Sequence, residues 1–129
     1  MSRERFELAR EQYRKALARL HTALAENETE IVRDAVIQRF EFTYELGWKC
    51  MFYWLRSEKE KVPEMPRPVI QAAFKAQMIT DADTWERLKD CRDETSHTYN
   101  ENKAVEVAAF VRGVAISAFD ALLVTLDAL

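Results

Sequence analysis

The chain has 129 residues, which is enough for one compact domain and too few for two. Hydrophobic residues make up 48% and charged residues 32%, a globular balance that argues against disorder, and two Gly and three Pro are too few for the turns of an all-β fold. The formal net charge of -3 means that no overall field attracts nucleic acid or an anionic membrane, so any contact with RNA must be local.

Two long amphipathic helices are predicted first. Between Ser2 and about Asn27, apolar residues recur three and four positions apart, with charged residues between them. A second stretch of this kind runs from about Glu28 to Lys59, and its apolar face is wider than one neighbouring helix can cover. Gly47 lies in this second helix, where it permits a neighbouring helix to approach closely.

All three prolines fall between Lys61 and Pro68, which predicts the one real loop, because proline removes an N–H and restricts the residue before it. Pro68 can occupy the first position of a short amphipathic helix that ends near Thr80.

Two further helices complete the chain. Asp81 and Asp83 are candidate N-caps for the next helix, and Glu86 follows Asp83 by three residues, as in a capping box. After a polar stretch over residues 94–103, a final apolar stripe runs from residue 105 to residue 126, and Asn100 or Asn102 can cap it. No segment alternates with period two. The sequence therefore predicts an all-α domain over residues 1–129, an antiparallel four-helix bundle with one extra short helix.

We expect a cytoplasmic protein that needs no metal and no cofactor. The first ten residues lack the apolar core of a signal peptide, and no uninterrupted apolar run has membrane-spanning length. Cys50 and Cys91 have no second Cys and no His at metal-ligand spacing, so we interpret them as reduced, half-buried thiols. No glycine-rich phosphate loop is present, so the chain is not itself a nucleotidyltransferase or an ATPase.

Residues 92–99 are the one segment of the sequence in which an Arg, a His and a Tyr that could take part in catalysis lie close together. Arg92 can bind phosphate in a fork, His97 titrates near neutrality and Tyr99 carries a phenol, which together suit cleavage or transfer of a phosphodiester. Five residues turn an ideal helix through about 140°, so either the helix ends between Arg92 and His97 or His97 works with groups from another chain. The alternative is structural: Arg92 pairs with a nearby carboxylate and His97 caps a helix end.

Three other features have structural interpretations. Glu45 and Lys49 stand four residues apart in the order that favours a helix-face ion pair. The aromatic residues of the second helix are expected first of all in the core and in a dimer interface. His21 is expected to be a satisfied surface or interfacial histidine rather than a ligand.

Three segments in order carry a family resemblance. Residues 92–99 have the form Arg, four residues, His, any residue, Tyr; residues 38–49 read QRFEFTYELGWK; and residues 66–74 read PRPVIQAAF. Taken in chain order, residues 38–49, then 66–74, then 92–99, they resemble the HepT-like branch of the HEPN superfamily and the nucleotidyltransferase substrate-binding proteins. The resemblance extends over nearly the whole chain.

The resemblance implies a helical-bundle homodimer that is encoded beside a minimal nucleotidyltransferase, its antitoxin. Some members are metal-independent ribonuclease toxins, silenced when that partner adds AMP to the motif tyrosine, which is Tyr99 here. By the same resemblance Arg92 and His97 are catalytic, with Asp93 and Ser96 supporting them. Members commonly have Asn where this chain has Asp93, a carboxylate that favours imidazolium but repels RNA.

The sequence leaves three functions open. The first is the toxin, an endoribonuclease with two motifs brought together across a two-fold axis. The second is a non-catalytic module that presents a substrate, or its own Tyr99, to the nucleotidyltransferase, and Asp93 favours it. Instead of being presented to the nucleotidyltransferase, Tyr99 could have a structural role, with its ring packed on the last helix and its hydroxyl hydrogen-bonded to Asp93 or Glu101. The third is a helical adaptor, which leaves the grouped Arg92, His97 and Tyr99 unexplained.

Overall fold

The computed structural model describes residues 2–96 and 100–129, and none of these residues lies in a β-strand. His97 and Tyr99 of the predicted site lie outside the described residues. The helices are α1 (Ser2–Leu24), α2 (Glu30–Ser57), α3 (Pro66–Lys75), α4 (Ala82–Thr95), α5 (Glu101–Phe110) and α6 (Ile116–Asp127), with a π-helical segment, Val111–Ala115, between the last two. Since α5, the π segment and α6 run on without a break, they form one helix, and the predicted all-α bundle with an extra short helix is confirmed.

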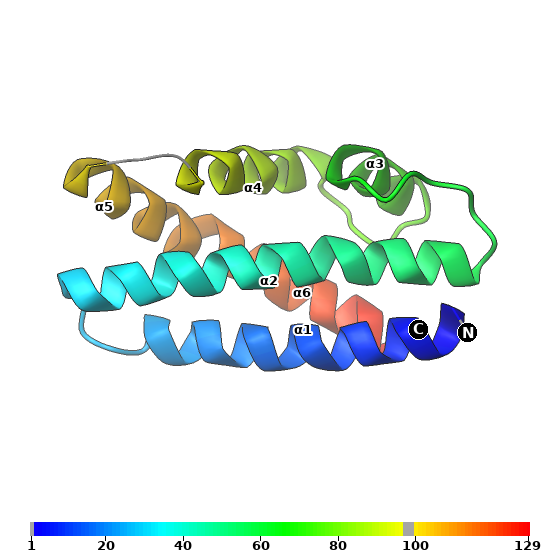
Figure 1. Ribbon diagram of the computed structural model, residues 1–129, viewed down its shortest axis with the longest axis horizontal. Helices are drawn as coiled ribbons and strands as arrows, with labels where there is room; N and C mark the ends of the chain where they lie inside the picture. Colours follow the sequence, from blue (N-terminus) through cyan, green and yellow to red (C-terminus); the bar gives the residue numbers. More distant parts are fainter. Residues whose placement is uncertain (1, 97–99) are drawn as a thin grey trace.

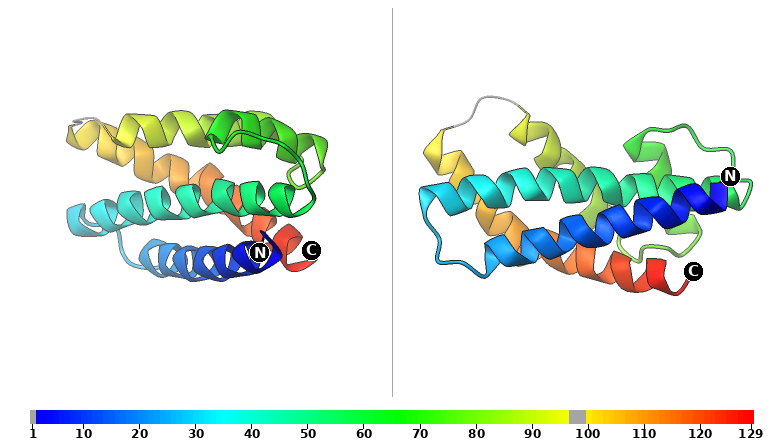
Figure 2. Two further views of the ribbon diagram at one scale, coloured as in Figure 1. Left: turned by 45° about the vertical axis from the view of Figure 1, so that its right-hand side comes forward. Right: turned by 60° about the horizontal axis from the view of Figure 1, so that its bottom comes forward.

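The bundle is built around α2. In Figure 1, α1 lies antiparallel along one side of α2, α3 and α4 lie along the other, and the last helix crosses behind. Figure 2 shows the same neighbours from two further directions, with the two chain ends close together. A hydrogen bond of 2.9 Å from Arg3 Nη2 to the carbonyl oxygen of Leu129 joins these ends. The wide apolar face of α2 is thus shared among several neighbours within one chain.

Side-chain caps fix three helix starts. Thr29 accepts a hydrogen bond from the Val32 N–H at the start of α2, and Asn100 accepts one from the Lys103 N–H at the start of α5. At the start of α4 the cap is Asp81, whose carboxylate accepts from both the N–H and the hydroxyl of Thr84. The predicted capping box at Asp83 is wrong, because the helix begins two residues earlier.

The proline segment is shorter than predicted. Helix α3 begins at Pro66 and has proline in its first turn, so Pro66 and Pro68 belong to the helix and only Pro63 lies in the loop. Proline is tolerated there because the first N–H groups of a helix have no partner within it. Helix α3 also ends at Lys75, before the predicted end near Thr80.

Aromatic rings from four helices meet in the core. The ring of Phe119 lies 5.9 Å from Phe40, 5.8 Å from Trp85 and 6.4 Å from Tyr13, measured between centroids. The Tyr13 hydroxyl donates a 2.7 Å hydrogen bond to the Phe119 carbonyl, so this buried polar atom is satisfied. A Cβ added at Gly47 would lie 3.1 Å from the Tyr13 ring and 3.2 Å from the Trp85 ring, so the close approach predicted there is confirmed.

Both cysteines are free and buried, more deeply than the predicted half-buried state. Burial raises the pKa of the Cys50 thiol to about 12 and that of the Cys91 thiol to about 11. Both therefore remain protonated at neutral pH, and buried neutral thiols are poor nucleophiles.

The last helix is long and apolar, although charged residues such as Arg112 and Asp120 interrupt it. Over Glu101–Asp127 its most apolar 18-residue window has a mean hydropathy of 1.9, so length and composition alone would allow it to cross a membrane, and 33% of that window is buried. Within the bundle its polar residues bind α1 and the segment that follows it: Asp120 contacts His21 at 2.6 Å, and Arg112 donates to the Leu24 carbonyl and pairs with Glu28 at 3.6 Å. The core helix of a bundle passes the same test of length and composition.

Candidate functional site at the end of helix α4

Arg92 lies in the last turn of α4 and reaches across to two carboxylates of α2. Its Nη1 donates to Glu41 Oε2 at 3.1 Å, and its Nε lies 3.3 Å from Glu45 Oε1, an ion pair whose alignment does not make a hydrogen bond. The Arg92 side chain is 27% exposed, so its charge is partly withdrawn from water. Two carboxylates around one guanidinium leave this cluster with a negative net charge.

Thr95 completes the cluster. Its hydroxyl is placed 2.7 Å from Glu41 Oε2, to which it donates, and 2.8 Å from the Arg92 carbonyl. Glu45 also accepts a 3.1 Å hydrogen bond from Trp48 Nε1, so both carboxylates are held at two points. These contacts orient the guanidinium before any ligand arrives.

The guanidinium has more donors than these two carboxylates engage. An arginine has five N–H groups, and the Glu41 and Glu45 contacts involve Nη1 and Nε. Nη2 makes no hydrogen bond to any residue within 2–96 or 100–129. Of the guanidinium nitrogens, Nη2 is therefore the one that neither of these carboxylate contacts involves.

The two residues expected to support the site lie beside it. Asp93 is exposed, and its carboxylate pairs with Lys89 at 2.7 Å, one turn back along α4. The Ser96 hydroxyl donates to the Asp93 carbonyl at 2.7 Å, and Ser96 is the C-cap of α4. The structure thus brings Arg92, Asp93 and Ser96 to one helix end, while the roles predicted for them stay predictions.

Tyr44 is buried in α2 next to Glu45. Its ring lies 6.2 Å from that of Trp85, and its hydroxyl is buried without a hydrogen-bond partner in the described parts of the chain. Burial, and secondarily the nearby Glu45 charge, raise the pKa of the Tyr44 phenol well above its ordinary value. The phenol is therefore neutral at all physiological pH values.

Sequence reasoning missed Glu41 and Glu45 as the partners of Arg92. The predicted helix-face pair between Glu45 and Lys49 is wrong: Glu45 turns to Arg92, while Lys49 lies over the Trp48 ring at 5.8 Å. The signal was present in part, because Glu41 and Glu45 are four residues apart on one edge of α2. The sequence pattern could not predict that α4 packs beside that edge of α2.

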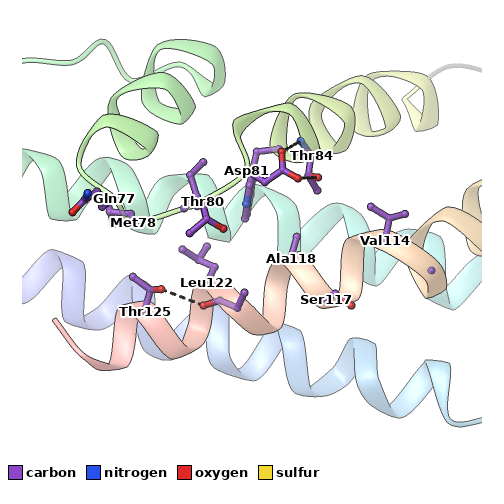
Figure 3. Close-up of a pocket in the computed structure, with 14 residues that line it drawn as sticks. Gln77, Met78, Thr80, Asp81, Thr84, Val114, Ser117, Ala118, Leu122 and Thr125 are labelled. Carbon is purple, nitrogen blue, oxygen red and sulfur yellow. Dashed lines mark hydrogen bonds between the residues drawn. The ribbon is translucent and has the colours of Figure 1, made fainter.

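Another pocket, of about 390 Å³, lies between the α3–α4 connection and the last helix (Figure 3). Asp81, its one charged lining residue, caps α4, and the Thr125 hydroxyl donates to the Ala121 carbonyl. It therefore offers a less capable chemical site than the Arg92 cluster. Within the described residues no group of three or more His, Cys, Asp or Glu side chains is placed to hold a metal ion.

Comparison with known proteins assigns the chain to a family. The profile of the family described as "Nucleotidyltransferase substrate binding protein like" matches residues 8–128. The chain belongs to this family. A curated relative from Haemophilus influenzae, named "Probable ribonuclease HepT", is 32% identical over 90 residues, which are 64% of this chain and 62% of the relative. The match therefore spans about three fifths of that relative's length.

A solved structure supports the fold. The crystal structure of a protein from Thermus thermophilus is 32% identical to this chain and superposes with a TM-score of 0.79. The similarity covers 88% of this chain and 98% of the other. The bundle is thus a fold already observed in a related chain.

Removing Glu41 should destabilise the protein measurably. Glu41→Ala leaves the part-buried Arg92 and Thr95 without their shared acceptor, which should cost about 1–3 kcal/mol of unfolding free energy. Asp93→Ala is the matched control: it removes an exposed carboxylate from a pair one turn apart and should cost less than about 0.5 kcal/mol. Urea unfolding of both variants measures the difference, and equal losses would show that Glu41 does not hold the site.

Proposed function

We propose that the chain is a HepT-like, metal-independent endoribonuclease, the toxin partner of a separately encoded minimal nucleotidyltransferase. Family membership and the similarity to a relative named as a ribonuclease support this class. The observation that carries the proposal is the placement of Arg92: two carboxylates orient it at the end of α4, with Nη2 left for a phosphate, directly before the segment that contains His97 and Tyr99.

The proposed chemistry is in-line attack of a ribose 2′-hydroxyl on the adjacent phosphate. A base takes the 2′-hydroxyl proton, the new 2′-oxygen to phosphorus bond forms, and the bond from phosphorus to the 5′-oxygen breaks as an acid protonates it. The products are a 2′,3′-cyclic phosphate and a 5′-hydroxyl. Arg92 binds the phosphate, and His97 moves protons. A homodimer would supply a second His97, so that one imidazole can act as base and another as acid.

Growth of a host cell tests the toxin assignment. Expression of the chain alone should arrest growth, and co-expression with the neighbouring nucleotidyltransferase should relieve the arrest. A variant with His97→Ala should be harmless in both cases. Normal growth with a soluble, folded wild-type chain would contradict the toxin function while leaving the family assignment intact.

A second candidate is a non-catalytic subunit that binds a substrate and presents it to the nucleotidyltransferase. The negative net charge of the cluster formed by Glu41, Glu45 and Arg92 favours it, since a site for RNA normally offers unpaired cations. Growth without arrest, together with a stable complex with the nucleotidyltransferase, would select this function.

Tyr99 is the proposed target of the partner. Transfer of AMP from ATP joins the phenol oxygen to the α-phosphate and releases pyrophosphate. The negative charge and the adenosine, added seven residues after Arg92 in the chain, would compete with RNA for that guanidinium. Incubation with the neighbouring nucleotidyltransferase, ATP and Mg²⁺ should add one or more AMP masses at Tyr99, as seen by mass spectrometry. Tyr99→Phe should prevent the addition. Tyr53→Phe, a change at another tyrosine, should leave it unchanged, and modification that persists in Tyr99→Phe would reject this site.

A further inference from the structure

A groove between α1 and α2 gathers cations that have no carboxylate partner within residues 2–96 and 100–129. Two hollows of about 260 and 210 Å³ border each other at Gln12 and Leu46, which line both, and together they are called the α1–α2 groove. Its charged residues are Arg5, Lys15, Arg19, Arg39 and Lys49. Among the described residues, none of these five forms an ion pair.

The lack of carboxylate partners is particular to the groove, as a comparison with the opposite edge of α1 shows. There, Arg3, Arg10 and Arg14 all meet carboxylates, and Arg14 contacts Asp127 at 2.5 Å. In the groove the hydrogen bonds are to neutral acceptors: Arg39 Nη1 donates to the Arg19 carbonyl, and Arg5 Nη2 donates to the Tyr53 hydroxyl. The described part of the chain therefore leaves the five positive charges without neutralising carboxylates.

The charges on the two sides of α2 are opposite. Glu41 and Glu45 face α4 and neutralise Arg92, whereas Arg39 and Lys49 line the groove with α1. In a chain with net charge -3, positive charge is therefore gathered away from the candidate site. A polyanion would bind first in the groove, because Coulomb attraction is strongest where cations are unpaired.

The groove also offers apolar and aromatic surface between its charges. Phe42 is 50% exposed and Leu8 is 54% exposed, although both are large apolar side chains. Arg5 and Arg19 are fourteen residues apart on α1, which places them about 21 Å from each other along the helix axis. Cations thus flank an exposed aromatic ring over the length of the groove, the combination that proteins use to bind single-stranded nucleic acids.

Charge also decides against two other occupants. A second copy of the chain docked by a two-fold axis through the groove would bring the five cations against their own equivalents. An acidic protein helix would need carboxylates placed to match both ends of the groove. A phosphodiester chain carries one negative charge per nucleotide and satisfies a row of cations in any register.

We propose that the α1–α2 groove is the binding surface for single-stranded RNA, with phosphates on its five cations and a base stacked on Phe42. The choice of RNA over other polyanions rests on the proposed function. RNA then binds mainly through the groove, and Arg92 need only position the phosphate that reacts.

Binding of a fluorescein-labelled 2′-O-methyl oligouridylate tests this, because the strand lacks the 2′-hydroxyl needed for cleavage. The triple variant Lys15→Gln, Arg19→Gln, Lys49→Gln should weaken binding on the order of 10- to 100-fold at 0.1 M salt. Its plot of log affinity against log salt should be shallower by about 2, the value expected for three lost phosphate contacts. Phe42→Ala should weaken binding without changing that slope.

The control removes the same charge from another part of the surface. Lys59→Gln, Lys61→Gln and Lys75→Gln remove three exposed lysines outside the groove, and this triple variant should bind as the wild type does. Equal affinity of the two triple variants for the oligonucleotide, or no binding by the wild type, would contradict the proposal that the groove binds RNA. Loss of self-association in the groove variant with unchanged RNA binding would assign the groove to a second copy instead.

The outcome also separates the groove from the proposed activity. If ordinary RNA is cleaved and the two triple variants bind with equal affinity, RNA binding by the groove is rejected and the ribonuclease activity is retained. If binding depends on the groove but ordinary RNA is not cleaved, RNA binding by the groove is retained and the ribonuclease activity is rejected.

Discussion

His97→Ala should reduce RNA cleavage by a factor of about 10² to 10⁴, the usual cost of removing a group that transfers protons. The chain contains only two histidines, so His21→Ala is a matched control. His21 pairs with Asp120 between α1 and the last helix, on the surface, and its loss should leave the cleavage rate unchanged. Rates on a labelled RNA in the presence of EDTA, with helicity checked by circular dichroism, give the comparison. Full activity of His97→Ala would end the catalytic assignment.

Arg92 can be tested without removing its charge. Arg92→Lys keeps a cation near Glu41 and Glu45 but loses the planar fork that binds a carboxylate and a phosphate at the same time. We expect folding to persist and cleavage to fall. An unchanged rate would mean that Arg92 acts only as a structural partner of the two carboxylates, the alternative interpretation of its sequence.

Phe119→Ala should destabilise the protein more than the loss of Glu41 does. The Phe119 ring is fully buried against Phe40, Trp85 and Tyr13, so its removal leaves a cavity bounded by four helices. Such truncations cost about 3–5 kcal/mol, a large part of the stability of a domain of this size. Phe119→Leu, which keeps much of the volume, should cost clearly less. Urea unfolding measures both, and equal, small losses would contradict the central place of this ring.

Helix positions could be predicted from the sequence because they depend on local patterns. The apolar spacing located α1 and α2 to within a few residues, and Asn100 was identified as one of two possible caps. Local patterns were ambiguous where two signals competed. Asp81 and Asp83 both suit an N-cap, so the start of α4 was left open between them, and Asp81 is the cap. Prolines suit a loop as well as a first helical turn, so the start of α3 was misplaced. The π segment at Val111–Ala115 had no sequence signal, because its residues fit an ordinary helix equally well.

The site was predictable only in part. Arg92 was singled out from its neighbours in sequence, but Glu41 lies 51 residues earlier, and the contact exists only because α4 packs beside α2. The same packing explains why Glu45 turns to Arg92 rather than to Lys49. The groove was missed for a similar reason: its five cations come from two antiparallel helices, and counting charges along the chain gives only the net value of -3.

The most direct test of the proposed ribonuclease is a comparison of two strands of identical sequence, one of RNA and one fully 2′-O-methylated, each incubated with the purified chain in EDTA. The account predicts that the RNA is cut into fragments that end in a 2′,3′-cyclic phosphate and begin with a 5′-hydroxyl, and that the methylated strand stays intact, since its 2′-oxygen cannot attack. Cleavage of the methylated strand, cleavage that stops when EDTA is added, or an RNA that remains intact would each contradict it.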